Sequence, residues 1–173
     1  MSWIVELLLS LGIALFLRLF VVNIARIHGH SMNPTLHHGD WALVWRLPYC
    51  FRPPRRHDVV ICHYPGRRMK RCKCLPQAFV KRVIGLPGDT IEFIEGTVYV
   101  NGTTLEEGYL DPRLCRSLRS RPARRLEKNE YFVMGDNRDH SNDSRSVGPI
   151  RRHAIRGRVV HILWSPGRPR RLF

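Results

Sequence analysis

A serine hydroxyl in a stiff loop is the first candidate for chemistry in this sequence. Ser31 lies in the stretch from His28 to Leu36, soon after an apolar N-terminal segment. Pro34 fixes its own φ angle and disfavours the helical region for Asn33, so we expect Ser31 in extended backbone that leads into a turn. These residue types are compatible with a nucleophile, although such a segment also arises by chance.

A lysine inside an apolar strand could supply the base for that nucleophile. Lys81 interrupts an apolar segment of strand length, and in a strand it shares one face with Phe79 and Val83. Burial disfavours the ammonium form, so a buried lysine can be neutral near pH 7 and accept a proton. The alternative for this segment alone is a lysine at a sheet edge whose amine reaches water.

A dense polar loop is the third candidate. It runs from Gly135 to Arg145 and follows the apolar residues Tyr131 to Met134. A loop that packs against strands must satisfy its polar groups internally, and Asp143 could pair with Arg145 to do so. Loops of this kind often support a site.

Histidines and cysteines offer competing chemistry. His30 directly precedes Ser31, but neighbouring side chains on extended backbone point apart, which disfavours a Ser-His mechanism. Cys62 lies in a strand pattern and is expected to be a small core residue. Zinc binding at Cys72 and Cys74 is possible, but their spacing is not the usual one. The pairing of the 5 cysteines stays open.

The charge of the chain narrows the classes of partner. Lysine and arginine number 29 against 14 acidic residues, which gives 29 − 14 = +15. Such a charge attracts polyanions, either nucleic acid or anionic lipid. No zinc finger, helix-turn-helix or aromatic RNA-binding pattern accompanies the basic clusters, so we expect no nucleic acid. Solvated loops explain these clusters, and we expect Leu114 to Arg125 to be a mobile insertion.

The N-terminal segment is predicted to be a membrane anchor. Residues 3–22 are apolar except for Glu6, Ser10 and Arg18. About 20 helical residues span the ~30 Å hydrocarbon core of a bilayer, so we predict one transmembrane helix within residues 1–24. A cleaved signal peptide and a buried core helix are the alternatives. The first lacks a basic n-region and a small-residue cleavage site.

The remainder, residues 25–173, is predicted to be a mainly β domain with antiparallel sheets. Short runs at residues 41–45, 58–62 and 159–164 have strand length and end in turn residues. Asn101-Gly102 predicts a hairpin with a type I′ turn. A chain of 173 residues allows one compact domain with a small subdomain. We expect a secondary β subdomain at about residues 91–130.

Taken together, these stretches resemble the type I signal peptidases, membrane-bound serine proteases with a Ser-Lys dyad and a LexA-like β fold. The resemblance extends from the N-terminal segment to about Trp164. The matching blocks appear in the family's order: Gly-x-Ser-Met-x-Pro-Thr-Leu around Ser31, Gly39-Asp40, Asp58 to Val60, Lys81 to Asp89, and Gly135 to Arg145.

The resemblance implies a role for each of these residues, without a metal or cofactor. Ser31 would attack the scissile carbonyl, and neutral Lys81 would act as the general base. Ser141 would orient the amine, and Asp143 with Arg145 would support that arrangement. The backbone N–H of Ser31 would bind the oxyanion.

One position departs from part of the family. Some members add a serine hydroxyl to the oxyanion hole from two residues before the nucleophile, where this chain has Gly29. The second oxyanion donor is therefore unassigned.

The resemblance also implies the substrate and the location. A preprotein signal peptide would bind as an added strand beside Lys81, with small residues at −1 and −3 of the cleavage site. The enzyme would be a single-pass protein of the cell membrane, with its catalytic domain on the extracytoplasmic face and held near anionic headgroups. The expected substrate-binding residues are Gly29, Met32, Leu36, Phe79 and Val80.

Two other classes of protein stay open. A self-cleaving, DNA-bound repressor uses Ser-Lys chemistry on a related β fold, but it needs a DNA-binding domain where this chain has an apolar segment. A non-catalytic binding module at a membrane surface would need no dyad. Cleavage of a preprotein by the wild type, compared with Ser31→Ala, discriminates between these classes.

Overall fold

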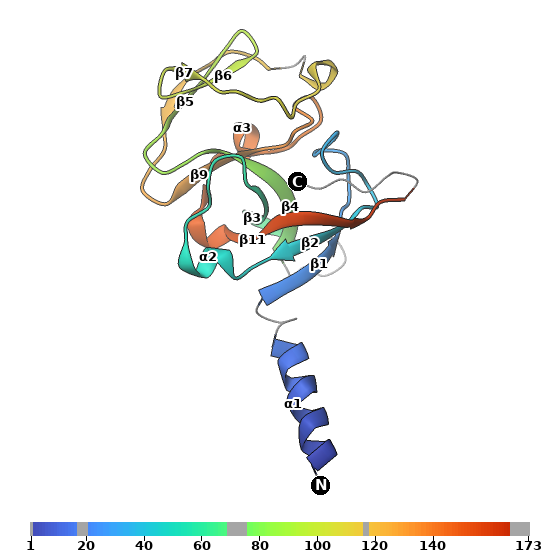
Figure 1. Ribbon diagram of the computed structural model, residues 1–173. Coiled ribbons are helices and arrows are strands. Elements are labelled where there is room, and N and C mark those ends of the chain that lie inside the picture. Colours follow the sequence, from blue (N-terminus) through green and yellow to red (C-terminus); the bar gives the residue numbers. More distant parts are fainter. Residues whose placement is uncertain (1, 17–20, 69–75, 116–117, 167–173) are drawn as a thin grey trace.

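The computed structural model describes residues 2–16, 21–68, 76–115 and 118–166. Two antiparallel sheets form the body, and an N-terminal helix extends from it (Figure 1). The elements are α1 Ser2–Phe16, β1 Val22–Arg26, β2 Trp41–Trp45, α2 Pro48–Phe51, β3 Val59–Arg68, β4 Pro76–Gly85, β5 Thr90–Ile94, β6 Thr97–Val100, β7 Thr103–Thr104, η2 Pro112–Leu114, β8 Arg121–Arg125, β9 Glu130–Met134, α3 Ser144–Val147, β10 Ile150–Arg151, η3 Arg152–Ala154 and β11 Ile155–Trp164.

The larger sheet contains seven strands in the order β1-β2-β11-β3-β4-β9-β10. The predicted strand at residues 41–45 is confirmed with these bounds. Strands β3 and β11 each contain 10 residues and are longer than predicted. Among the extra residues, His63 and Arg68 pair with β4, and Gly157 and Arg158 pair with β3, although they break the apolar run.

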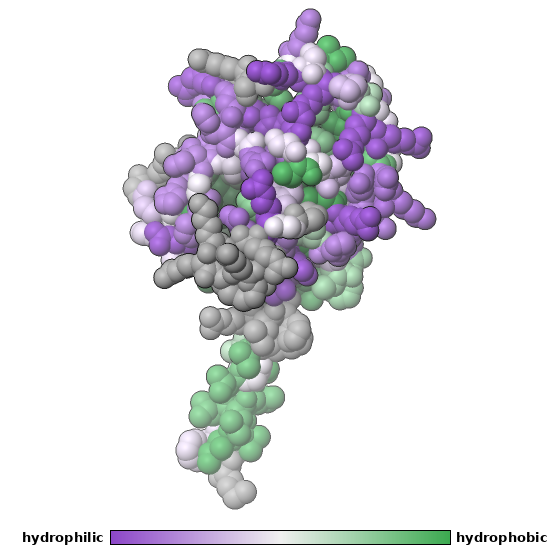
Figure 2. All heavy atoms as spheres, turned by 180° about the vertical axis from the view of Figure 1, so that it is seen from behind, coloured by the Kyte–Doolittle hydropathy of each residue, from purple (hydrophilic) through white to green (hydrophobic). Residues whose placement is uncertain are grey.

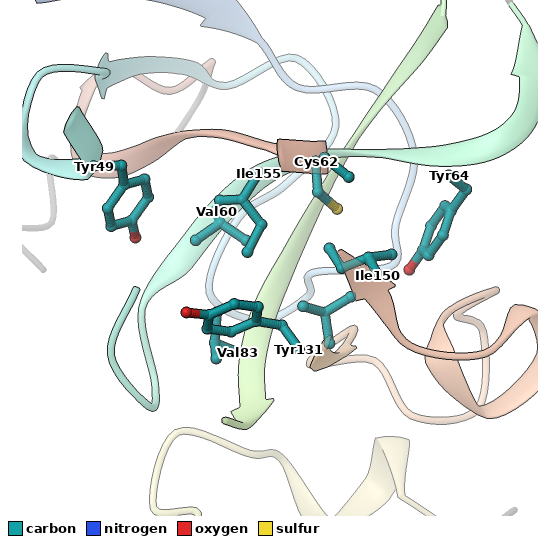
Figure 3. Packing of buried hydrophobic residues seen from close by; sticks show 10 residues of the cluster. Tyr49, Val60, Cys62, Tyr64, Val83, Tyr131, Ile150 and Ile155 are labelled. Carbon is teal, nitrogen blue, oxygen red and sulfur yellow. The ribbon is translucent and has the colours of Figure 1, made fainter. Parts of the chain in front are cut away.

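One face of this sheet carries the core cluster of Figure 3, to which β3, β4, β9 and β11 contribute. Val60 pairs with Lys81, and Cys62 pairs with Phe79, so these side chains share a face. Cys62 is fully buried, which confirms it as a core residue. Burial raises the pKa of its thiol to about 12, so this cysteine is inert near neutral pH. Lys81 thus lies at the margin of a buried, apolar region.

A second cluster holds the segment that carries Ser31. Met32 and Leu36 are buried with Ala42 and Val44 of β2 and with residues of β11. Burial of an apolar side chain of this size contributes about 1.5–3 kcal/mol. The buried side chains of Met32 and Leu36 therefore fix the loop between β1 and β2 to the larger sheet.

The smaller sheet contains four strands in the order β7-β6-β5-β8 and extends from Thr90 to Arg125. The Asn101-Gly102 hairpin is confirmed, with positive φ angles of 54° and 78° at its two turn residues. The prediction of a mobile insertion is wrong for Arg121–Arg125, which pairs with β5 as strand β8. All residues of β8 are exposed, so backbone pairing forms this strand without the alternating pattern that reveals one.

Residues 3–15 of the N-terminal helix α1 are all exposed and mostly apolar, and Figure 2 shows one apolar face of this helix. The prediction of a continuous helix over residues 3–22 is wrong at its end, because Val22 begins β1 and pairs with Trp45. Apolar content alone does not separate a helix from a strand, and β1 is rich in residues that suit both. Residues 17–20 lie outside the described residues. Within the described part of the chain, no helix is long and apolar enough to cross a membrane.

Three of the cysteines lie within the described residues. Cys50, Cys62 and Cys115 are free thiols, and Cys62 alone among these three is buried. Cys72 and Cys74, the possible zinc ligands, lie outside the described residues. Among the residues that are described, no group of His, Cys, Asp or Glu is arranged to hold a metal ion.

Candidate active site

Ser31 and Lys81, 50 residues apart in sequence, meet beside the larger sheet. The distance between Lys81 Nζ and Ser31 Oγ is 2.8 Å. Lys81 is only 2% exposed, and this burial lowers the pKa of its amine, although the carboxylate of Asp143 acts in the opposite direction. A neutral amine at this distance can accept the hydroxyl proton, because 2.6–3.2 Å is the usual range for such transfer. The arrangement can therefore generate a serine nucleophile.

The backbone around Ser31 differs from the prediction. Residues 31–35 form a turn, so Ser31 lies within the turn and not in extended backbone before it. The Leu36 N–H donates to the Met32 carbonyl at 2.9 Å and closes this turn. The Asn33-Pro34 peptide bond is cis, a geometry that the sequence did not indicate.

Ser141 and Asp143 extend the contact network from the lysine. Lys81 Nζ donates to Ser141 Oγ at 3.1 Å. Asp143 is fully buried and accepts from Arg145 Nε and Nη2, both at 2.8 Å. Burial alone would raise the pKa of Asp143, but its bonds with Arg145, Gly135 N–H and Ser141 hold that pKa below its usual range. A carboxylate thus stands behind the serine that contacts the amine.

The polar loop also holds the Ser31 segment directly. Asn137 N–H donates to the Ser31 carbonyl at 3.1 Å, and Asn137 Nδ2 donates to the His30 carbonyl at 3.2 Å. The crossing of the two segments depends on Gly135. A Cβ atom at Gly135 would lie 2.3 Å from Ser141 Oγ and 2.4 Å from the Ser31 carbonyl oxygen. Only glycine permits this approach.

A second buried network supports the turn after Ser31. Arg82 Nε donates to Asp136 Oδ1 at 2.8 Å, and Arg82 Nη2 donates to Asp136 Oδ2 at 2.6 Å. Thr35 Oγ1 donates to the same carboxylate. The guanidinium of Arg82 also lies 3.8 Å from the ring centre of Tyr109. These hydrogen bonds to Asp136 connect the serine turn, through Thr35, with Arg82 of β4 and with the polar loop.

The smaller sheet reaches the same loop through Arg138. Its guanidinium is fully buried and donates from Nη1 to Glu107 at 2.9 Å, with a second bond from Nη2 to the same carboxylate. Arg138 Nε donates to the Gly135 carbonyl at 3.1 Å. The residues after β7 are therefore connected to the loop that supports the dyad.

The positions of Gly135, Arg82, Asp136 and Asn137 as supports were missed in the sequence. Each acts through a contact between segments that are distant in the chain. The available signal was the proximity of Arg82 to Lys81 and the presence of a glycine inside a dense polar loop.

The residues expected to bind substrate divide into two groups. Gly29 is exposed, and Phe79 and Val80 of β4 are half-buried, so these three can touch a peptide at the surface. Met32 and Leu36 are 2% and 0% exposed, so they lie beneath the surface as core residues. Their side chains can therefore lie only at the floor of a substrate pocket and cannot form its walls at the surface.

The histidines lie to the side of the dyad. His30 is exposed, and the centre of its ring lies 5.8 Å from that of His38. His38 Nδ1 accepts a hydrogen bond from the Gly29 N–H at 3.1 Å. Ser31 Oγ has Lys81 as its partner instead, as described above.

Comparison with known proteins places this chain in a family. Residues 1–164 match the family described as signal peptidase, peptidase S26. Signal peptidase I of Leptolyngbya laminosa is 38% identical over 162 residues, covering 92% of this chain and 77% of the relative. The probable signal peptidase I-1 of Synechocystis is 41% identical over 154 residues, covering 89% and 77%. Signal peptidase I of Bacillus caldolyticus is 36% identical over 159 residues, covering 86% and 82%.

A mainly β chain with a serine hydroxyl against a buried amine thus has the features of a hydrolase with a serine nucleophile. The chain belongs to the signal peptidase family, peptidase S26. Its activity is that of a serine endopeptidase.

Proposed function

We propose that this endopeptidase removes N-terminal signal peptides from preproteins, with Ser31 as nucleophile and Lys81 as general base. The observation that carries the proposal is the 2.8 Å contact between the Ser31 hydroxyl and a buried amine whose pKa is lowered. The names of the relatives support the substrate class.

The reaction has two stages, acylation of Ser31 and hydrolysis of the acyl-enzyme. Lys81 Nζ takes the proton of Ser31 Oγ while the oxygen attacks the scissile carbonyl carbon. The tetrahedral intermediate collapses, the C–N bond breaks, and the ammonium returns that proton to the leaving amine. A water molecule then attacks the acyl-enzyme, with Lys81 again as base, and releases the signal peptide from Ser31.

Ser141 acts as a positioning residue in this scheme. Its hydroxyl keeps the Lys81 amine directed at Ser31, and Asp143 with Arg145 holds Ser141 in place. The Asp143 carboxylate also lowers the free-energy cost of forming the Lys81 ammonium ion during the reaction, because opposite charges attract strongly at low dielectric.

The oxyanion forms beside the backbone of Ser31, whose N–H is its first donor. Gly29 offers no hydroxyl, and its N–H already donates to His38. A single oxyanion donor contributes about 2.7–4 kcal/mol to transition-state binding. The site therefore relies heavily on the Ser31 N–H.

The peptide before the cleavage point lies extended along β4 and adds a strand there. Phe79 and Val80 then border its side chains, while the buried Met32 and Leu36 close the floor. Pockets of this kind admit a methyl group and exclude larger groups by clash, so small residues at −1 and −3 are preferred.

Helix α1 attaches the enzyme to the cell membrane, and the two sheets, from β1 onward, form the catalytic domain on the extracytoplasmic face. Helix α1 exposes its apolar side chains, which a bilayer would cover. Beside β1, one face of the larger sheet adds exposed aromatic residues. Register and exposure place Ile24, Trp41, Trp45 and Trp164 on this aromatic face.

Cleavage of a preprotein by the detergent-solubilised full chain tests the proposed function. Wild type should release the signal peptide, and Ser31→Ala and Lys81→Ala should each abolish release. His30→Ala serves as the matched control and should retain activity. Loss of activity in His30→Ala together with activity in Lys81→Ala would reject the dyad.

A further inference from the structure

A pocket of about 290 Å³ opens beside Ser141, on the side of the polar loop that faces β8. Guanidinium groups dominate its lining, with one acidic side chain among them. The polar and charged residues that line it include Arg119, Arg121, Arg138, Asp139, Ser141 and Arg145.

The lining keeps a positive charge after its ion pairs are counted. Arg138 pairs with Glu107, and Arg145 pairs with Asp143. Asp139 is the third carboxylate of the group. Four guanidinium groups against three carboxylates give 4 − 3 = +1 among the described residues.

Arg119 and Arg121 carry that excess. Both are exposed, and neither forms an ion pair with a carboxylate within the described part of the chain. Arg121 Nη1 donates to the Arg145 carbonyl, which directs this side chain across the loop. Two guanidinium groups at the rim of a pocket suit a carboxylate ligand, because their planar donors match its oxygens.

The chemistry of the dyad decides which part of a substrate meets this pocket. Lys81 returns its proton to the leaving amine, so the first residue of the mature protein lies beside that amine. Ser141 contacts Lys81 at 3.1 Å and also lines the pocket. Phe79 and Val80, which border the signal peptide, are absent from the lining. The pocket is therefore on the leaving-group side.

We propose that this pocket binds an acidic side chain within the first residues of the mature chain, and so sets a preference after the cleavage point. The proposal rests on the function proposed above. It adds a specificity site for the mature segment to the apolar groove for the signal peptide.

The location of the pocket favours a peptide over a lipid headgroup as its occupant. Helix α3 and the smaller sheet lie at the end of the body away from α1 and from the start of β1 (Figure 1). A bilayer around α1 would lie at the opposite end. The mature part of a translocated chain leads away from the membrane and toward this pocket.

Paired peptide substrates test the proposal. Each pair contains glutamate or the isosteric glutamine at position +1, +2 or +3, with the signal-peptide side unchanged. At low ionic strength, wild type should show a kcat/KM about fivefold higher for glutamate at one of these positions. Salt should reduce that ratio, because it screens exposed charges.

Variants of the rim arginines assign the effect to the pocket. Arg119→Gln should lower the glutamate-to-glutamine ratio, and Arg119→Gln with Arg121→Gln should bring it to about one. Double charge reversal, Arg119→Glu with Arg121→Glu, should transfer the preference to lysine at the same position. Arg124→Gln is the matched control, since Arg124 lies on the same exposed strand but does not line the pocket.

Three results would overturn the proposal, and they are distinguishable. Efficient cleavage of every pair at equal rates by wild type removes the subsite and leaves the proposed function intact. No cleavage of any peptide removes both. A ratio near one, combined with weaker binding of the double variant to anionic vesicles, identifies a lipid site instead.

Discussion

The amine of Lys81 can act as a base only while it is uncharged, and its surroundings determine when that is so. Burial disfavours the ammonium form and lowers the pKa below 10.5, although Asp143 opposes the shift. The fraction of neutral amine rises as the pH passes through that lowered pKa. We therefore expect kcat/KM to increase with pH and to reach a plateau below the range of an ordinary lysine.

The pH profile of kcat/KM checks this expectation. Ser141→Ala supplies the diagnostic comparison, because the hydroxyl contacts the amine and, in the proposed mechanism, does not take part in bond making. The variant should shift the midpoint of the profile as well as lower its plateau. A midpoint near 10.5 in the wild type would contradict the role of burial.

Gly135 offers a second prediction for a single residue. Gly135→Ala places a methyl group 2.3 Å from Ser141 Oγ and 2.4 Å from the Ser31 carbonyl oxygen, so one of these segments must move. A displacement of about 1 Å in a catalytic group costs about 100-fold in rate. We expect at least that loss in kcat for preprotein cleavage.

A matched control separates this clash from a general effect of alanine. Gly108→Ala adds a methyl group where nothing lies within 4 Å, so its activity should equal that of the wild type. Equal activity in both variants would show that the approach at Gly135 is not required.

Asp143 gives the third prediction, and it concerns stability. Asp143→Asn removes a buried charge and leaves Arg145 without its partner, which typically costs about 3–5 kcal/mol. Urea unfolding of the detergent-solubilised protein should show a decrease of that order. An unchanged midpoint would mean that the ion pair does not contribute.

The pH dependence of the same pair has a definite sign. The pKa of Asp143 is lowered in the folded protein, so its contribution is complete above the unfolded value near 3.8 and is lost as pH falls through the folded value. The stability difference between wild type and Asp143→Asn should therefore shrink below about pH 4.

Among single residues, Ser31 and Lys81 could be selected from the sequence because each has an unusual local setting, whereas Ser141 was expected only from the resemblance to the family. A lysine between apolar strand residues and a serine before proline are visible without a structure. Gly135 and the Arg82–Asp136 pair are not, since their importance arises where distant segments cross. Met32 was expected to shape a shallow substrate pocket, but it is only 2% exposed, because an apolar residue beside a nucleophile can equally lie in the core.

At the scale of elements, the aromatic face formed by β1, β2 and β11 has a testable role. Trp45 and Trp164 are 42% and 54% exposed, and a bilayer surface would cover them. Each tryptophan replaced by serine should weaken binding to phospholipid vesicles at least about fivefold, because aromatic burial is lost. Vesicle sedimentation of the full chain measures this binding.

Ile94→Ser provides the comparison for the aromatic face. Ile94 is 42% exposed, as Trp45 is, but it belongs to the smaller sheet. Its replacement should leave vesicle binding unchanged. Equal losses in the tryptophan and isoleucine variants would remove the special role of the aromatic face.

The elements themselves were predicted with uneven success, and hydropathy explains why. Strands with apolar alternation, such as β2, and the Asn101-Gly102 hairpin carry strong local signals. Strand β8 has none, because all five of its residues are exposed and its order comes from backbone bonds to β5. The boundary between helix and strand before β1 was also hidden, since both elements are apolar there.

For the whole molecule, charge and hydropathy are distributed unequally. The formal charge is +15, while the apolar surface lies mainly on α1 at one end (Figure 2). This polarity suits a protein that contacts a bilayer at one end and an aqueous substrate chain at the other. Because the positive charge is carried by the body and not by α1, the proposed arginine-lined pocket can attract a carboxylate at a distance from the membrane.

The separation of the catalytic groups along the chain has a consequence for the timing of activity. Lys81 lies 50 residues after Ser31, and Ser141 lies 60 residues after Lys81. A nascent chain that has emerged only as far as β4 contains both dyad residues but lacks the loop that holds them. With the proposed dyad, we therefore expect no peptidase activity from a nascent chain until the polar loop has been synthesised and its contacts with Lys81 and with the serine turn have formed.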